Sequence, residues 1–428
     1  MTEASGSTDI SVTAHQSLLH DRRFRRLFGA HAISFLGDGM VNVATAFAVI
    51  SRGGSASDIG IVFAARMLAL VLCILVGGVL ADRVPRRMIM ATADLVRVCS
   101  QGGFAALILT GSGTVGELAA LAGVTGAATG FFNPASTGLL PSVVAGERIQ
   151  QANALRGLAL AAGQVVGPAV AGGLIAAFGA GSALAFDAAT FGASALLLLS
   201  LDIPAAADFS HESFSRDLRD GWRAFRARTW VWSFVGGAAV GNFVFAAWGV
   251  LGPVVAHSRM GGAATWGAIV SAFGGGSVLG GIVALRLRPA RPMLVASASV
   301  SVFSLPLALL ALGSGPLLVG AGAFLSGVGL MVANTLWEST LQRHIPQAAL
   351  SRVSAYDWFG SMAFEPLGFA MWGVVASAIG IGVSLWIAFT VQIMSVAALL
   401  MVPDIRHLPA YPDAHRPSRT ASPADTAG

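Results

Sequence analysis

The sequence has no lysine, few charged residues and only two cysteines. Charged residues make up 11% of the 428 positions, whereas soluble domains carry about 25%. Cys73 and Cys99 lie inside apolar runs, which argues against a disulfide framework or a zinc site. The formal charge of +5 therefore comes from arginine. Because the arginines cluster between apolar runs, we expect no nucleic acid partner.

Patterns for catalysis and for nucleotide binding are missing as well. The chain has no G-x-x-x-x-G-K-[ST] loop for ATP. His31 and His257 are isolated in the sequence, and neither a Ser-His-Asp arrangement nor a His-rich metal pair can be discerned. The sequence therefore predicts a protein that is not an enzyme and that uses no cofactor and no metal.

Long apolar runs are what the sequence has in abundance, with 55% hydrophobic residues. Stretches of roughly 20 apolar residues, enough to span a bilayer, recur along the whole chain. They predict an all-α polytopic membrane protein with twelve transmembrane helices. The expected helices are 27–50, 58–81, 88–110, 115–140, 152–177, 181–201, 230–255, 264–285, 292–312, 316–341, 353–378 and 382–402.

A polar interval at 202–228 divides these helices into two sets of six. It has mixed charge and is expected to be a cytoplasmic central loop with a short surface helix. We therefore expect an N-terminal six-helix bundle at 22–201 and a C-terminal one at 229–403. The ends, 1–21 and 404–428, are rich in Ser, Pro and Ala and are expected to be disordered in the cytoplasm.

The positions of the arginines predict the orientation in the membrane. The loops on one side hold only Arg52 and Arg259, while the clusters at 22–26, 83–87 and 286–291 and the central loop fall on the other side. Positive charge is retained in the cytoplasm. We therefore expect a multi-pass protein of the cell membrane with both termini in the cytoplasm.

The segment GGVLADRVPRR at 77–87 is repeated, less perfectly, as GGIVALRLRPAR at 280–291. Each copy ends the second helix of its half, but Asp82 in the first copy corresponds to Leu285 in the second. A carboxylate at a helix C-terminus faces the unfavourable end of the dipole and needs a partner. A solvated ion pair with Arg83 or Arg86 is the simplest alternative.

This segment resembles the G-x-x-x-D-R-x-x-R-R loop between helices 2 and 3 of the major facilitator superfamily, and the resemblance covers about residues 22–403. The matching residues are Gly78, Asp82, Arg83, Arg86 and Arg87. The resemblance implies a secondary transporter with two pseudo-symmetric six-helix bundles. It also implies that these residues form a conformational latch, in which Asp82 lies near 351–355 when the protein is open to the outside and the arginines tie the halves together.

The second motif is GQVVGPAVAGG in the fifth helix. Pro168 frees the carbonyl of Gln164, so a bend with close helix packing is one interpretation. The motif also resembles the G-P-x-x-x-G-G signature of drug:proton antiporters, which implies export. Finer features at 37–38, 94–97 and 152–153 resemble the macrolide-efflux and enterobactin-exporter group. The motif residues are Gly163, Gly167, Pro168, Gly172 and Gly173.

Ionisable residues at membrane depth are costly and are therefore functional candidates. Asp38, Arg66 and Glu365 lie closest to the expected midplane, and a carboxylate beside a cation is suited to proton coupling. Nearer the cytoplasm we favour a structural ion-pair network over proton carriage. Its expected members are Asp94, Arg97, Arg156 and Asp357.

Helices 1, 4, 7 and 10 line the central cavity in the family that the chain resembles. This implies a set of cavity-lining candidates, although any one of them could serve packing or hydrogen bonding instead. The candidates are Asn42, Asn133, Asn242, Trp248, Asn334, Trp337 and Glu338.

Together these features predict a monomeric transporter that exports a small amphipathic or lipophilic molecule, such as a drug, an antibiotic or a siderophore-like compound. The expected partners are this small-molecule substrate, protons and the lipid bilayer. An uptake symporter and a membrane receptor on the same scaffold remain as alternatives.

Overall fold

The computed structural model describes residues 18–81, 84–144, 146–201, 219 and 222–411, and they form helices and connecting turns. Eleven segments of this part are long and apolar enough to cross a membrane. A further helix, α3 (Arg86–Leu109), packs among them with 24 residues but carries several charges. The predicted all-α membrane fold is therefore confirmed, with α3 as the twelfth helix of the bundle.

The first six long helices pack together, and those that follow residue 228 form a second group. The first group is α1 (Arg22–Ser51), α2 (Ala56–Ala81), α3, α4 (Val115–Leu139), α5 (Ile149–Phe178) and α6 (Ala180–Leu199). The second is α8 (Thr229–Arg259), α9 (Ala263–Arg286), α10 (Pro292–Val300), α11 (Ser304–Ala311), α12 (Pro316–His344), α13 (Gln347–Met362), α14 (Glu365–Ile379) and α15 (Ile381–Met401).

Two of the helices predicted as continuous are interrupted. The segment expected at 292–312 consists of α10, a 3-10 turn at Ser301–Phe303 and α11. Pro306 cannot donate to the carbonyl of Val302, which accepts a bond from the Ser326 hydroxyl at 2.8 Å instead. The segment expected at 353–378 is likewise divided into α13 and α14, because Pro366 cannot continue the hydrogen-bond pattern of α13.

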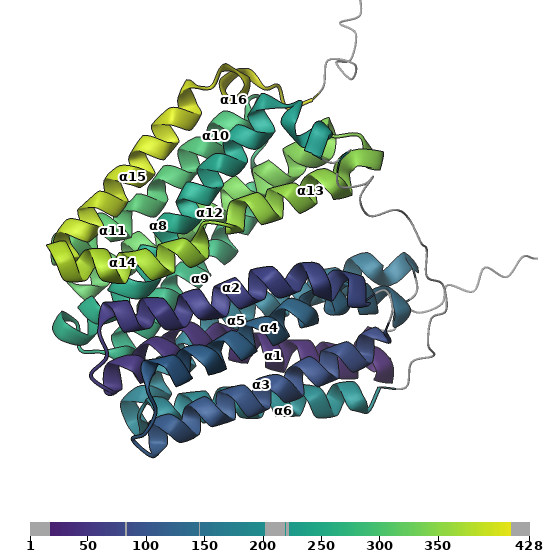
Figure 1. The fold of residues 1–428 in the computed structure, drawn as a ribbon. Coiled ribbons are helices and arrows are strands. Elements are labelled where there is room, and N and C mark those ends of the chain that lie inside the picture. Colours follow the sequence, from purple (N-terminus) through teal and green to yellow (C-terminus); the bar gives the residue numbers. More distant parts are fainter. Residues whose placement is uncertain (1–17, 82–83, 145, 202–218, 220–221, 412–428) are drawn as a thin grey trace, which may run out of the picture.

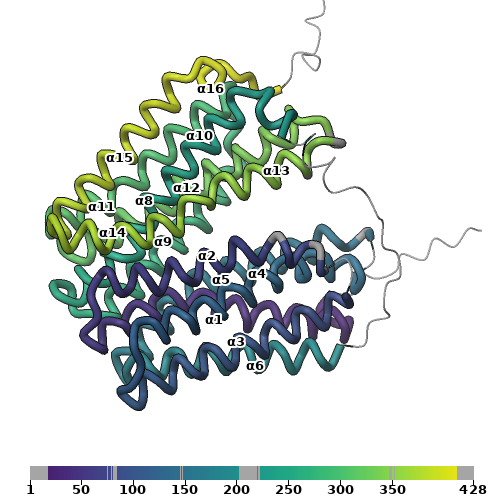
Figure 2. Tube along the Cα trace, viewed as in Figure 1, coloured from purple at the N-terminus to yellow at the C-terminus, as the bar shows by residue number. Residues whose placement is uncertain are grey.

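The two groups lie side by side and touch at one end. Figures 1 and 2 show that they diverge toward the end at which α1 begins and α15 ends. At the closed end α2 packs on α14, and α5 packs on α9. The molecule is therefore closed at the end opposite to the one at which α1 begins and α15 ends.

Glycines allow these contacts between the halves to be made backbone to backbone. A Cβ atom on Gly373 of α14 would lie 2.5 Å from the Ser57 Cα of α2. A Cβ on Gly172 of α5 would lie 2.6 Å from the Ala263 carbonyl oxygen of α9. Any larger residue at either position would push the halves apart.

The two copies of the sequence repeat pack alike. A Cβ on Gly77 of α2 would lie 2.6 Å from the Gly130 carbonyl of α4, and a Cβ on Gly280 of α9 would lie 2.5 Å from the Val328 carbonyl of α12. The second glycine of the first copy, Gly78, faces open space in the described structure. The first glycine of each copy is thus the one that brings the helices together.

The predicted boundaries of the polar segments shift slightly. Residues 404–407, expected within a disordered tail, belong to the short helix α16 (Pro403–His407). Residues 222–226 are helical, and the rings of Trp222 and Phe225 pack on Tyr356. In the predicted N-terminal tail, Leu18–His20 form a 3-10 helix. Apart from residues 21, 219, 227–228 and 408–411, the rest of the predicted tails and of the central loop lies outside the described residues.

Candidate functional site

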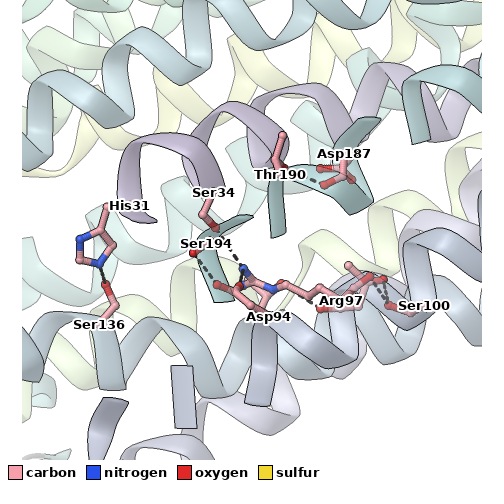
Figure 3. Close-up of polar contacts among 11 residues, drawn as sticks. His31, Ser34, Asp94, Arg97, Ser100, Ser136, Asp187, Thr190 and Ser194 are labelled. Carbon is pink, nitrogen blue, oxygen red and sulfur yellow. Dashed lines mark hydrogen bonds and ion pairs between the residues drawn. The ribbon is translucent and has the colours of Figure 1, made fainter. Parts of the chain in front are cut away.

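A charged pair lies fully buried in the first group of helices (Figure 3). The Arg97 Nη1 and Asp94 Oδ1 atoms of α3 are 3.2 Å apart, and neither side chain is exposed. Ser194 of α6 donates its hydroxyl to Asp94 at 2.6 Å. The Arg97 guanidinium lies over the rings of Phe132 of α4, at 4.5 Å, and Phe191 of α6, at 4.9 Å. The pair therefore ties α3 to both neighbouring helices.

Arg156 belongs to a separate cluster with His31. The ring nitrogen Nε2 of His31 lies 2.7 Å from the Ser136 hydroxyl, and Arg156 Nη2 donates to the same hydroxyl at 3.4 Å. Arg156 also lies over the Phe35 ring at 5.5 Å. This cluster joins α1, α4 and α5.

The predicted four-residue ion-pair network is therefore wrong in this state. Only Asp94 and Arg97 are paired among the described members of that set. Asp357 lies on α13 in the second group, where Trp337 and Ser361 donate to it at 2.9 and 3.3 Å. Because α13 and α3 belong to different groups, which are apart at this end, the helix that carries Asp357 is separated from α3.

Asp38 and Arg66 are close but are not paired directly in the described structure. Arg66 Nη1 of α2 donates to Asn42 Oδ1 of α1 at 3.0 Å. The charges of Asp38 and, from the other half, of Glu365 act on the guanidinium. Glu365 is the first residue of α14, directly after the break in the helix. Arg66 thus lies within electrostatic reach of a carboxylate from each half.

Asp187 of α6 is a further buried carboxylate, for which the sequence predicted no specific role. Gln101 Nε2 donates to its Oδ2 at 2.5 Å, while Oδ1 has no hydrogen-bond partner among the described residues. A Cβ on Gly37 would lie 2.5 Å from that Oδ1, so the glycine makes room for the carboxylate. Its charge also acts on Arg66. The Gly37-Asp38 pair in the sequence was the available signal for this close approach.

The fifth-helix motif joins α5 to two neighbours. A Cβ on Gly163 would lie 2.7 Å from the Phe35 carbonyl carbon of α1, and one on Gly167 would lie 2.8 Å from the Gly39 Cα. Gly172 contacts α9 instead. The Gln164 carbonyl, which Pro168 leaves without a helical donor, would lie 2.7 Å from a Cβ on Gly274 of α9.

Two arginines of the predicted latch make described hydrogen bonds within the N-terminal half. Arg86 Nη1 donates to the Gly138 carbonyl in the last turn of α4 at 2.6 Å. Arg87 donates to the Leu201 carbonyl just after α6. Asp82 and Arg83 lie outside the described residues. In this state Arg86 and Arg87 therefore stabilise helix ends of the N-terminal half.

The predicted cavity-lining residues divide into two sets. Asn242, Asn334, Trp337 and Glu338 all line a cavity of about 400 Å³ within the second group. Trp248 does not fit this prediction, because it is buried and its ring lies 4.5 Å from that of Trp266.

Two further candidates lie in the first group. Asn42 is exposed and is held by Arg66. Asn133 is half-buried on α4.

The sequence and the fold match those of known transporters. A family model described as "Transmembrane secretion effector" matches residues 13–423. The enterobactin exporter EntS of Escherichia coli strain K12 is 30% identical over 420 residues, covering 93% of this chain and 95% of that protein. The multidrug efflux pump Tap of Mycobacterium bovis strain BCG is 30% identical over 191 residues, 43% of this chain and 45% of that protein.

Solved structures are similar in fold. The nucleoside transporter NupG matches with a TM-score of 0.70 and 14% identity, over 88% of this chain and 98% of that one. A bacterial homologue of the lysosomal transporter Spinster matches with a TM-score of 0.66 and 14% identity, over 90% and 96%. The chain therefore belongs to the transmembrane secretion effector family of major facilitator transporters and is not an enzyme.

Proposed function

We propose that this transporter exports a small amphipathic or lipophilic molecule across the cell membrane in exchange for protons. The observation that carries the proposal is the backbone contact between the halves at one end, with the halves apart at the other. Such an arrangement is one of the two end states of alternating access. The arginine distribution favours the cytoplasm as the open side.

Export is favoured over uptake by the relatives. The two relatives are named as an exporter and as an efflux pump. The fifth-helix motif, which resembles the signature of drug:proton antiporters, makes the contact between α5 and α9. The rival is an uptake symporter on the same scaffold. A drug-susceptibility panel in a pump-deficient host, with enterobactin export measured beside it, identifies candidate substrates.

Proton coupling is supported by three carboxylates whose charges act on Arg66. Asp38 and Asp187 come from one half and Glu365 comes from the other. When the halves move, the distance from Arg66 to Glu365 changes, and a moving cation changes a carboxylate's affinity for protons. We assign the proton first to Asp38 and second to Glu365.

The test is flux in proteoliposomes that contain the full chain as a monomer. An imposed pH gradient should drive substrate against its concentration gradient, in the direction opposite to the proton flow. Flux in the same direction as the protons would establish the uptake symporter. Tight binding without any flux would favour a receptor.

A further inference from the structure

The cavity in the second group of helices is lined by carboxylates, an amide side chain and aromatic rings. It lies between α8, α12, α13 and α15, and its volume of about 400 Å³ is within the range of small-molecule sites. Figure 1 shows α13 at the edge of this group that faces α2 across the opening. One of the helices that line the cavity, α13, therefore faces the opening between the two groups.

Two carboxylates line this cavity. Glu338 of α12 is exposed, and the charge of Asp357 of α13 acts on it. Neither carboxylate has an ion-pair partner in the described part of the chain. Asp357 accepts bonds from Trp337 Nε1 and from the Ser361 hydroxyl, which fix its orientation and leave acceptor capacity on its oxygens. The cavity thus carries negative charge that no described side chain neutralises.

One residue that lines the same cavity carries an unsatisfied acceptor. Gln392 of α15 lines it, is 1% exposed, and its Oε1 has no hydrogen-bond partner among the described residues. A buried acceptor without a partner costs free energy. A ligand with several N–H donors would remove that cost, whereas a carboxylate or a phosphate would be repelled by Glu338 and Asp357.

Aromatic rings form an apolar wall beside these acceptors. The rings of Phe234 and Trp337 stack at 4.5 Å, and Trp358 lines the cavity as well. Aromatic faces attract cations, and they also bury the apolar part of an amphipathic molecule. The acceptors, the negative charge and the aromatic rings therefore all favour a cationic ligand that has N–H donors and an apolar body.

We propose that this cavity binds the protonated amine of an amphipathic amine, with Glu338 and Asp357 as counter-charges and Gln392 as a third acceptor. The inference rests on the proposed function, because the amine that binds in this cavity is taken to be part of the exported molecule. It narrows the substrate class to organic amines with an apolar or aromatic body.

The test compares two probes that differ in one group. Dansylcadaverine has an aromatic body and a primary amine, and its analogue carries a hydroxyl in place of the amine. Binding is measured by fluorescence with the full chain in lipid nanodiscs, and empty nanodiscs serve as the blank. The amine should bind about tenfold tighter or better, since hydrogen bonds to charged groups are worth more than 1.4 kcal/mol. Equal affinity for the two probes would overturn the proposal.

Variants locate the site. Glu338→Gln, Asp357→Asn and Gln392→Leu should each weaken amine binding, by about tenfold for the acidic positions, and should leave binding of the hydroxyl analogue unchanged. Retained binding of that analogue shows that the variant is folded. Asp404→Asn, which removes an exposed carboxylate of α16 in the same half, is the matched control. A full amine preference in the Glu338→Gln and Asp357→Asn double variant would contradict the assignment.

Flux separates this inference from the proposed function. If the amine preference is present but a pH gradient drives no flux of dansylcadaverine or of any panel substrate, export by proton exchange fails while the binding site stands. If panel substrates are exported but the amine preference is missing, the binding site fails while export stands.

Discussion

Gly172 of α5 lies against Ala263 of α9 at the closed end of the molecule, where the two halves meet. The neighbouring Gly173 has no atom of the described structure within 4 Å of the position its Cβ would occupy. Two adjacent glycines of one motif thus have different surroundings. The family motif in the fifth helix accordingly has a physical role at Gly172, which is to permit backbone contact between the halves.

Substitution of these two glycines should show whether transport depends on the contact between α5 and α9 or only on the presence of glycine in the motif. Gly172→Val places a side chain against the Ala263 carbonyl and should destabilise the closed end, by about 1–3 kcal/mol as overpacking usually does. Flux should then fall roughly tenfold or more. Gly173→Val adds the same side chain in open space and should retain flux. Equal loss in both variants would show that the contact with α9 is not the reason.

Asp94 and Arg97 of α3 should contribute to stability only when both are present. Arg97→Met leaves Asp94 buried with a charge and without its partner, which typically costs about 3–5 kcal/mol. The thermal unfolding midpoint in detergent should fall accordingly. The double variant Asp94→Leu with Arg97→Met should regain much of the loss, because neither charge is left unpaired. A double variant less stable than Arg97→Met would contradict this account.

The latch predicted from the sequence should be asymmetric. Asp82→Asn should shift the balance between the open states more than Leu285→Asn, because only the first copy of the repeat carries a carboxylate for the N-terminal end of α13. Leu285 is 79% exposed, so its replacement alters little packing. Distances between spin labels at the diverging ends of α6 and α12 measure the balance. An equal shift in both variants would contradict the assignment of Asp82 to the latch.

Most of the helices were predictable because they are apolar runs bounded by polar or glycine-rich turns. The breaks at Phe303 and Phe364 were not predicted, since a proline in an apolar run fits either a bend or an interruption and tertiary contacts decide between them. Those contacts include the bond from Ser326 to the Val302 carbonyl.

The site was predictable only in part. A lone Asp or Asn in an apolar helix can be recognised from the sequence, but its partner on another helix depends on the rotation of both helices. Asp187 with Gln101, and Gln392 in the cavity, were missed for this reason. Asp357 was assigned to a network across the halves, whereas the open state places it in a cavity of its own half.

In the proposed mechanism, a carboxylate near Arg66 couples export to protons. Asp38→Asn tests it most directly, in proteoliposomes that contain either wild-type or variant protein. Flux driven by an imposed pH gradient and substrate exchange at equal pH are measured on the same preparations. The account predicts that the variant loses pH-driven flux and keeps exchange. Full pH-driven transport by Asp38→Asn would contradict it.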